Sequence, residues 1–452
     1  MSLFQGVQVD AKIFWQKFSE IALTQENWTL PPLNHEILFS ALEKMRKTLI
    51  ERSAIYNGLK SDLEKVLRSE EVEQSISSLI DFISPHQLST KLRRELGTDF
   101  PFELKRISFR EEHFECWFPQ GTLAHITPNN SPLLNVFALI EGLLSGNVNL
   151  LKLARKDTDF AEIFFAHLCK MESSGELKKY IYIHRVSSKN TDDLKKFLSV
   201  ANVISAWGNE ESITSIKSLA PANAEVVAWG HKISVAYVTA ETKHETETLD
   251  LLAKEICLNE QQACSSPQVI YLETDSTKEL RAWAQKFAEH LDRTSAKTVQ
   301  NELDPLEYAE INVQSEQVRL AEVLDENLLI QSPHGDWRIF VEDNRALRTS
   351  PLFRSIWIKP LLKTQIVETL APMKKYLQTV GLSAATKESI ELLPLLFRTG
   401  FLRINPIGKM TESYNGEPHD GVYALQKFCK RVSFTDDIKL QGFASLEMIK
   451  RN

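Results

Sequence analysis

The sequence contains few cysteines and no marked excess of either charge. Its five cysteines are an odd number and include no C-x-x-C pair, which argues against a disulfide framework and a zinc knuckle. Lys and Arg total 53 against 60 Asp and Glu, giving a net charge of −7, which disfavours a nucleic-acid partner. The eleven histidines lack metal-ligand spacing, so we expect no metal.

Long apolar runs and the common catalytic motifs are also missing. No apolar run approaches the ~18 residues of a membrane span, and the first five residues lack a signal-peptide pattern, so we expect a cytoplasmic protein. G-x-G-x-x-G, Walker A, H-E-x-x-H and G-x-S-x-G do not occur. With 452 residues, 43% hydrophobic and 25% charged, the chain suits two or three globular domains.

Short apolar strands alternate with helical patterns from Gly121 onward. This alternation predicts a mainly parallel sheet with helices on both faces, an α/β class of fold. The predicted strands are 122–126, 148–153, 180–184, 202–206, 225–228 and 233–238, and the predicted helices are 132–144, 157–171 and 210–219. A dinucleotide would bind at the carboxyl ends of such strands.

The chain divides into four predicted parts. They are a helical N-terminal segment over 1–105, an α/β unit over 106–248 that begins with a hairpin at 106–118, a second α/β unit over 249–382, and a C-terminal segment over 383–452.

A stretch of small and polar residues from Asn259 to Pro267 separates a predicted helix from the predicted strand 269–272. In it, Cys264 is followed by Ser-Ser-Pro, where backbone N–H groups can converge on a thiolate and on a neighbouring oxyanion. The pattern alone leaves two interpretations open, a nucleophile or a small buried thiol in a turn. Cys257 is the nearest alternative, but it lies in an apolar helical pattern where thiols are usually inert.

Glu260-Gln-Gln-Ala-Cys264 is similar to the catalytic cysteine motif of the aldehyde dehydrogenase superfamily. The longer string 259–268 resembles the long-chain acyl-CoA reductases, the fatty acid reductase component of bacterial luminescence systems. Further segments resemble the superfamily in the expected order, namely 119–126, 128–132, 146–152, 207–211 and 229–232. The resemblance covers roughly residues 105–430 and leaves the N-terminal hundred residues outside it.

This resemblance implies an aldehyde dehydrogenase-like fold, with a Rossmann-like cofactor domain, an α/β catalytic domain and a β-hairpin bridging arm. Cys264 would be the nucleophile, and Asn130 with the Cys264 N–H would form the oxyanion hole. Asn130 could instead cap the helix that begins at Pro132. The implied cofactor contacts are Thr127, Pro128, Lys152, Arg155, Gly208, Asn209 and Gly230.

The sequence departs from the superfamily at a catalytic base. Aldehyde-oxidising members place a glutamate at the start of the Gly-Lys segment to activate the deacylating water, and this chain has Ala228 there. Without that base, water should attack a thioacyl enzyme slowly, which favours reduction of the acyl group over hydrolysis. Glu225 and Glu260 lie close in sequence and could substitute for the missing base.

A second departure concerns the cofactor. Many NAD-using relatives carry an acidic residue three positions after the cofactor lysine, whereas Lys152 is followed by Leu-Ala-Arg155-Lys156. Arginine binds phosphate oxygens and a carboxylate would repel a 2′-phosphate, so the sequence favours NADPH. The alternative is that Lys152, Arg155 and Lys156 form a solvated basic turn.

Two further segments have no assigned role. The stretch 350–355 lacks the glutamate of the superfamily's Glu-x-Phe-Gly-Pro motif, so that cofactor contact stays unassigned. Pro418-His-Asp-Gly421 suggests only a turn.

The resemblance therefore implies NADPH-dependent reduction of a medium- to long-chain fatty acyl thioester to the aldehyde through a Cys264 thioacyl enzyme. A short-chain acylating aldehyde dehydrogenase, an aldehyde oxidiser and an acyl-holding subunit of a reductase complex are the alternatives. Family analogy implies a homo-oligomer, with a partner enzyme that delivers the acyl group and a C-terminal segment that closes the site and makes oligomer contacts.

Overall fold

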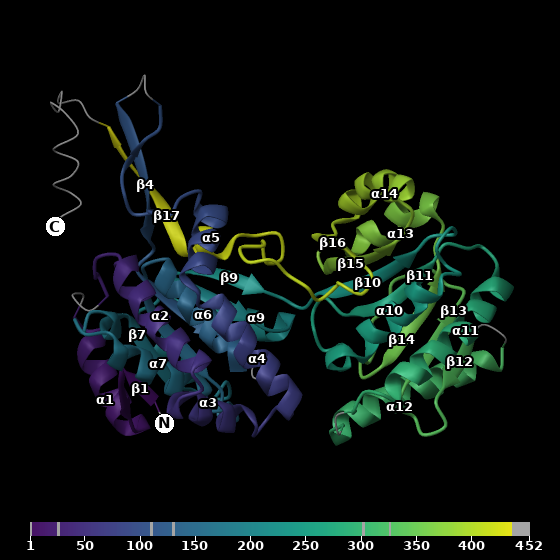
Figure 1. Cartoon of the computed structure of the whole chain (residues 1–452), viewed down its shortest axis with the longest axis horizontal. Helices are drawn as coiled ribbons and strands as arrows, with labels where there is room; N and C mark the ends of the chain where they lie inside the picture. The colour runs from purple at the N-terminus through teal and green to yellow at the C-terminus, as the bar shows by residue number, and fades with distance from the viewer. Residues whose placement is uncertain are drawn as a thin grey trace. The chain divides into compact units, whose positions relative to one another are not determined.

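The computed structural model describes residues 2–24, 28–108, 112–128, 132–300, 303–324 and 327–435 (Figure 1). The chain forms two compact units. Unit 1 combines the residues up to Gly230 with those from Tyr414 onward, and unit 2 is the continuous stretch 231–413. No helix in these described ranges is long and apolar enough to cross a membrane.

Unit 1 is built on a seven-stranded sheet in the order β2-β1-β7-β6-β5-β8-β9. The strands are β1 (Ser2–Phe4), β2 (Val7–Val9), β5 (Thr122–Ile126), β6 (Val148–Leu153), β7 (Ile181–Arg185), β8 (Val203–Trp207) and β9 (Glu225–Trp229). The connecting helices are α6 (Pro132–Leu144), α7 (Phe160–Met171), α8 (Thr191–Leu198) and α9 (Glu210–Leu219). Strands β5 to β9 pair in parallel, which confirms the predicted α/β class.

The strand order reverses between β5 and β8. From β5 the chain adds β6 and β7 on one side, and then returns to place β8 and β9 on the other. In open α/β sheets, ligands bind outside the carboxyl ends of the strands at such a reversal. The segments that follow β5 and β8, beginning at Thr127 and Gly208, therefore lie where this fold class binds ligands.

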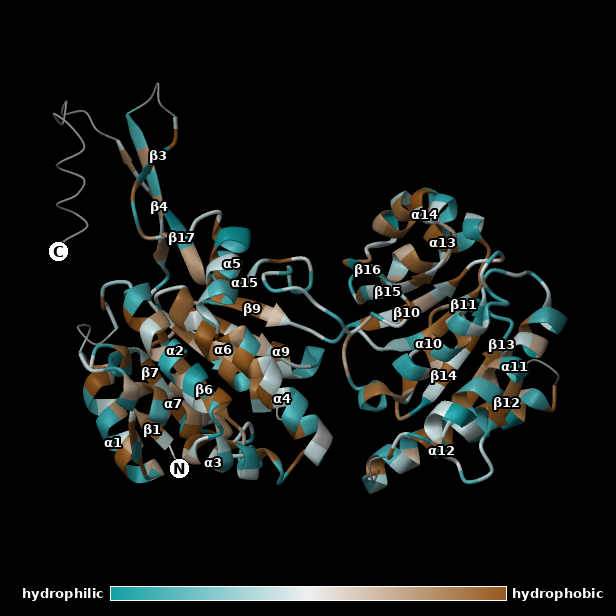
Figure 2. Ribbon diagram, viewed as in Figure 1, coloured by the Kyte–Doolittle hydropathy of each residue, from teal (hydrophilic) through white to brown (hydrophobic). Residues whose placement is uncertain are grey.

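Full burial explains why β5 and β6 are mainly apolar on both faces. Every residue of both strands is buried, as expected when helices cover both faces of a sheet. Figure 2 shows hydrophobic residues concentrated on the inner strands and on the helix faces packed against them.

The N-terminal segment is not purely helical. Its five helices are α1 (Ala11–Ala22), α2 (His35–Ile50), α3 (Ala54–Leu63), α4 (Ser69–Phe82) and α5 (Pro85–Leu96). However, β1 and β2 extend the sheet of unit 1, and β1 pairs antiparallel with β7. Three-residue strands are too short to show a clear alternation of polar and apolar side chains, so the sequence did not reveal them.

A separate three-stranded sheet forms an arm on unit 1, made of β3 (Lys105–Arg106), β4 (His113–Pro119) and β17 (Cys429–Thr435). β3 and β4 fall in the region where the sequence predicted a hairpin. All seven residues of β4, however, pair antiparallel with β17, which follows α15 (Ala424–Phe428) near the end of the described chain. The arm therefore joins two segments that are remote in sequence.

Unit 2 contains a second seven-stranded sheet, in the order β12-β13-β14-β11-β10-β15-β16. Its strands are β10 (Ile233–Val238), β11 (Pro267–Leu272), β12 (Asn327–Gln331), β13 (Arg338–Glu342), β14 (Ser355–Pro360), β15 (Leu377–Ser383) and β16 (Arg403–Pro406). Its helices are α10 (Thr246–Cys257), α11 (Thr277–Ser295), α12 (Pro305–Glu322), α13 (Ile366–Leu370) and α14 (Thr386–Thr399). Only the edge strand β12 pairs antiparallel in this sheet.

The boundary between the units differs from the predicted position near residue 248. The sequence pattern predicts β10 as part of the first unit, but this strand lies at the centre of unit 2, between β11 and β15. Its apolar pattern is the same as that of the strands in unit 1, so only the pairing partners distinguish the two sheets.

Candidate active site

Cys264 lies in the loop between a short 3-10 helix (Leu258–Gln261) and β11. It is exposed, whereas the other four cysteines are buried. Burial raises the pKa of each of those four thiols, to about 12 for Cys169, which disfavours the reactive thiolate. Among the five, exposure therefore singles out Cys264 as the thiol that a substrate can reach, and the inert environment expected for Cys257 is present.

The backbone of Cys264 is held by a buried serine on the central strand β10. Ser234 Oγ donates to the carbonyl oxygen of Cys264 at 2.7 Å and accepts the Thr379 N–H at 3.1 Å. The next turn is fixed by Gln261, whose Nε2 donates to the Pro267 carbonyl at 2.8 Å. These bonds tie the cysteine loop to β10, β11 and β15.

Two loops of unit 2 have left-handed backbone at three consecutive residues each, the first of them at the irregular 3-10 turn that begins at Leu258. In residues 259–261 the φ angles are 49°, 51° and 60°, and in residues 352–354 they are 63°, 50° and 59°. Non-glycine residues in this region cost roughly 1–3 kcal/mol each and persist where surrounding contacts over-determine them. One of these loops directly precedes Cys264.

A buried ion pair joins the two loops. Arg354 donates through Nη2 to Glu260 Oε1 at 2.7 Å and through Nε to Oε2 at 3.1 Å. The Phe353 N–H also donates to the Glu260 carbonyl at 3.0 Å. Arg354 reaches the end of α11 as well, through bonds to Ser295 Oγ at 2.8 Å and the Val299 carbonyl at 3.0 Å. This bidentate Glu260–Arg354 pair supplies the contacts that hold the left-handed loops.

The Glu260–Arg354 pair bears on whether Glu260 can replace the base that is missing at Ala228. Both carboxylate oxygens of Glu260 bind a guanidinium that is 1% exposed, so this carboxylate is occupied. Glu225 begins β9, and its carboxylate forms an ion pair with Lys427 at 3.6 Å. The exposed Ala228 lies three residues further along the strand, ~10 Å from Glu225. The suggestion that either glutamate replaces the base is therefore not supported.

In unit 1, the predicted cofactor residues gather at the carboxyl ends of the parallel strands. Thr127 follows β5, and its hydroxyl donates to Asn135 Oδ1 on α6. Gly208 and Asn209 follow β8, and Asn209 caps α9 by accepting the Ser212 N–H at 2.9 Å. Pro128 is the last described residue before a gap, and Asn130 lies outside the described residues.

Lys152 is a buried cation near the end of β6. It is 7% exposed, and burial lowers the pKa of its ammonium group, a shift opposed by Asp157. Within the described ranges, its ammonium makes no hydrogen bond or ion pair. Asp157 Oδ2 is instead engaged by the Ala154 N–H at 2.6 Å. A buried ammonium without a partner favours a polar or anionic ligand at this position.

An arginine that no sequence motif marks holds the loop after β6 through hydrogen bonds to its backbone. Arg185, at the end of β7, donates to the carbonyls of Ala154, Asp157 and Thr158 at 3.2, 2.6 and 2.8 Å. This loop carries Arg155, which is exposed. Only the folded chain reveals the link, because the carbonyls that Arg185 binds carry no signature in the sequence.

The turn of the C-terminal segment packs against the ends of β8 and β9. The His419 ring centroid lies 4.6 Å from that of Trp207 and 5.0 Å from that of Trp229. Trp229 is fixed by its Nε1, which donates to Ser205 Oγ at 2.9 Å. At the end of β9, Gly230 has no atom within 4 Å of the position of a Cβ. The turn at 418–421, which had no role from sequence, thus lies beside the predicted cofactor residues.

The fold is that of the aldehyde dehydrogenases. The structure is similar to the crystal structure of bifunctional proline utilization A (PutA), with a TM-score of 0.72 and 15% identity over 95% of this chain and 45% of that chain. It is also similar to aldehyde dehydrogenase 21 from Physcomitrella patens, with a TM-score of 0.69 and 13% identity over 94% and 91% of the two chains.

Within this fold, the model of the acyl-CoA reductase (LuxC) family matches residues 32–431, and the chain belongs to that family. The resemblance seen in the sequence is thereby confirmed.

Curated relatives are long-chain acyl-protein thioester reductases. One from Photobacterium leiognathi is 25% identical over 71% of this chain and 66% of its own length. Another from Aliivibrio fischeri is 22% identical over 70% and 64%. The chain thus aligns with slightly less than two thirds of the length of these relatives.

Proposed function

We propose that the chain reduces a medium- to long-chain fatty acyl thioester to the aldehyde, with NADPH as reductant and Cys264 as the acyl carrier. The observation that carries the proposal is Cys264 itself, an exposed thiol in a loop fixed by Ser234 and the Glu260–Arg354 pair. The direct test is formation of tetradecanal from tetradecanoyl-CoA and NADPH by the purified protein. Absence of aldehyde across a series of chain lengths and donors would contradict the proposal.

Two covalent steps follow from a cysteine nucleophile. The Cys264 thiolate attacks the carbonyl carbon of the donor, the donor thiolate leaves and takes up a proton, and the acyl group stays on Cys264 as a thioester. When bound, NADPH would supply the hydride that reduces this thioester, and release of the aldehyde would restore the Cys264 thiolate. We assign Asn130 and the Cys264 N–H to the oxyanion that develops on the acyl oxygen.

The residues of unit 1 suit a pyridine nucleotide. Lys152 is a buried residue whose ammonium makes no hydrogen bond or ion pair with the described residues, and Thr127 and Gly208 lie at the strand reversal. Arg155 is exposed on a loop that Arg185 fixes, which suits it to a 2′-phosphate. We assign Pro128, Asn209 and Gly230 to the same site.

Cofactor preference tests the role of Arg155. Changing Arg155 to glutamate is expected to lower kcat/KM for NADPH by about 10- to 100-fold, since a charge-assisted hydrogen bond is lost and a repulsive charge introduced. In the same variant, kcat/KM for NADH should change little. Lys195→Glu, which makes the same charge change on α8, is the control. Equal wild-type efficiency with NADH and NADPH would contradict the assignment.

The direction of reaction can be tested at Ala228. We expect Ala228→Glu to restore the base of the aldehyde-oxidising relatives and to raise hydrolysis of the thioacyl enzyme by roughly 10²-fold, within the range of general-base catalysis. Release of tetradecanoic acid without nicotinamide measures this step. Ala228→Gln has the same size but no base, and should leave hydrolysis slow. A wild-type protein that hydrolyses the acyl group as fast as it reduces it would contradict the argument.

The acyl donor is a separate question. The relatives are named acyl-protein thioester reductases, which favours an acyl-protein donor. We therefore propose a partner protein that transfers its acyl group to Cys264, with acyl-CoA as an alternative. Comparing kcat/KM for tetradecanoyl-CoA and acetyl-CoA separates this function from a short-chain acylating dehydrogenase. An acyl-holding subunit would hold the acyl chain without reducing it, so a Cys264→Ala protein that still supported the partner's output would favour that alternative.

A further inference from the structure

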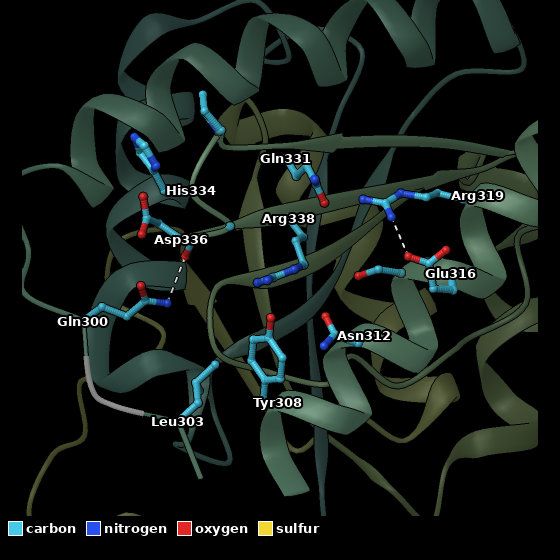
Figure 3. A pocket seen from close by; sticks show the side chains of 13 residues that line it. Gln300, Leu303, Tyr308, Asn312, Glu316, Arg319, Gln331, His334, Asp336 and Arg338 are labelled. Carbon is cyan, nitrogen blue, oxygen red and sulfur yellow. Dashed lines mark hydrogen bonds and ion pairs between the residues drawn. The ribbon is translucent and has the colours of Figure 1, made fainter. Parts of the chain in front are cut away.

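A polar pocket of about 650 Å³ lies in unit 2 between α12 and the turn that joins β12 to β13. None of the residues assigned to catalysis or cofactor binding lines it. Figure 3 shows the side chains of Tyr308 and Asn312, on α12, directed toward Arg338 on β13. Gln331 and His334 also line the pocket.

Arg338 is a buried residue, and one nitrogen of its guanidinium makes no hydrogen bond with the described residues. The residue is 6% exposed, and its Nη1 atom is buried and has no hydrogen-bond partner among the residues that the structure describes. Its backbone is fixed, because the Arg338 N–H donates to the Arg354 carbonyl at 2.9 Å. A buried guanidinium with an unused hydrogen-bond donor is unfavourable, and an anion bound by the part of Arg338 that lines the pocket would offset some of that cost.

The neighbouring charged groups leave this guanidinium available. Glu316, the carboxylate of α12 that lines the pocket, forms an ion pair with Arg319. Asp336 lies close enough to oppose the lowering of the Arg338 pKa by burial, but it makes no ion pair with Arg338. Tyr308 and Asn312 make no side-chain hydrogen bond with any described residue, so both can donate to a ligand.

Strand register places the pocket at the same edge of the sheet as Cys264. Val269 on β11, Trp357 on β14 and Phe340 on β13 are aligned across three parallel strands. Cys264 precedes Val269 and Arg338 precedes Phe340, so both lie toward the amino ends of these strands. At ~4.8 Å per strand, β13 is ~10 Å from β11. The buried pair connects the two regions: the Arg354 carbonyl accepts the Arg338 N–H, and Glu260, the partner of Arg354, lies four residues before Cys264.

We propose that this pocket binds a phosphate group, with Arg338 as the principal cation and Tyr308 and Asn312 as further donors. A tetrahedral oxyanion suits donors that converge from two elements, and arginine binds phosphate oxygens in pairs. The phosphate can come from the phosphopantetheine arm of an acyl donor or from free inorganic phosphate. The first source rests on the proposed function, whereas phosphate binding itself does not.

The binding test uses the full chain and isothermal titration with inorganic phosphate and, separately, with phosphopantetheine. We expect both to bind the wild-type protein and Arg338→Gln to weaken binding at least tenfold. Arg293→Gln, which removes an exposed arginine of α11, should bind as the wild type does. Circular dichroism establishes that the variants are folded. If Arg338→Gln does not fold, Tyr308→Phe replaces it, with weaker phosphate binding expected.

Kinetics then distinguish the two sources. If the donor arm occupies the pocket, Arg338→Gln raises KM for tetradecanoyl-phosphopantetheine but leaves KM for the phosphate-free tetradecanoyl-N-acetylcysteamine unchanged. If free phosphate occupies the pocket, Arg338→Gln leaves KM unchanged for both donors. The titration still shows weaker binding of inorganic phosphate to this variant. The proposal is overturned if neither phosphate compound binds the wild-type protein at millimolar concentration, or if Arg338→Gln and Tyr308→Phe both bind as the wild type does. An absence of reductase activity together with phosphate binding would overturn the proposed function alone.

Discussion

Replacing Cys264 with alanine is expected to abolish both covalent acylation and reduction of the thioester. Without the thiolate there is no covalent intermediate, and loss of a nucleophile commonly lowers kcat by at least ~10³-fold. The measurement is the intact mass of the protein after incubation with tetradecanoyl-CoA and no nicotinamide. The native protein should gain the mass of one tetradecanoyl group, and Cys264→Ala should gain none.

Two controls make this result specific. Cys257→Ala removes the nearest other thiol, which is buried in α10, and should leave the mass increment intact. Addition of NADPH to the acylated native protein should discharge the increment as tetradecanal. An increment that persists in Cys264→Ala would show that another residue carries the acyl group. If no increment forms with any chain length or donor, the covalent mechanism is wrong.

Breaking the Glu260–Arg354 pair is expected to have the largest effect on the stability of unit 2. Arg354→Met leaves a carboxylate that is 4% exposed without its partner, and removal of one member of a buried pair typically costs about 3–5 kcal/mol. The left-handed backbone at 259–261 also loses contacts that hold it. We therefore expect slower acylation of Cys264 together with the loss of stability.

Hydrogen exchange measures this effect within unit 2. Peptides from α11 and β14 should exchange faster in Arg354→Met, and Glu260→Gln combined with Arg354→Met should recover part of the protection, because the unpaired charge is removed. Arg345→Met is the matched control, since Arg345 pairs with Glu368 on the surface at 3.1 Å. Exposed ion pairs contribute ~0–1 kcal/mol to the free energy of unfolding. Equal effects in Arg354→Met and Arg345→Met would contradict a structural role for the buried pair.

Sequence periodicity located the elements of the parallel sheets closely. The predicted helices at 132–144 and 210–219 have the bounds of α6 and α9, and the predicted strand at 148–153 has those of β6. These segments are long enough to show a period and are buried by local packing, so the pattern of apolar side chains determines them. The cysteine motif is equally local, and it lies within the residues that the family model matches.

Contacts between distant residues could not be predicted in the same way. Glu260 and Arg354 are 94 positions apart, and nothing in either neighbourhood marks them as partners. The left-handed angles at 352–354 involve Leu, Phe and Arg, which are not residues that favour such a backbone. Arg338 likewise has the pattern of an ordinary strand residue, and only the folded chain shows that its Nη1 atom has no partner in the described part of the chain. Such features depend on tertiary packing rather than on local preference.

The pairing of β4 with β17 has a consequence for synthesis of the protein. Strand β4 emerges from the ribosome early, but its partner begins only at Cys429, after all of unit 2 has been made. At 5–20 residues per second, this interval lasts roughly 15–60 s. During that time one edge of β4 has unpaired backbone groups, which favours association with other nascent chains. Unit 2, a continuous stretch of chain, can fold during this interval, while the arm of unit 1 closes last.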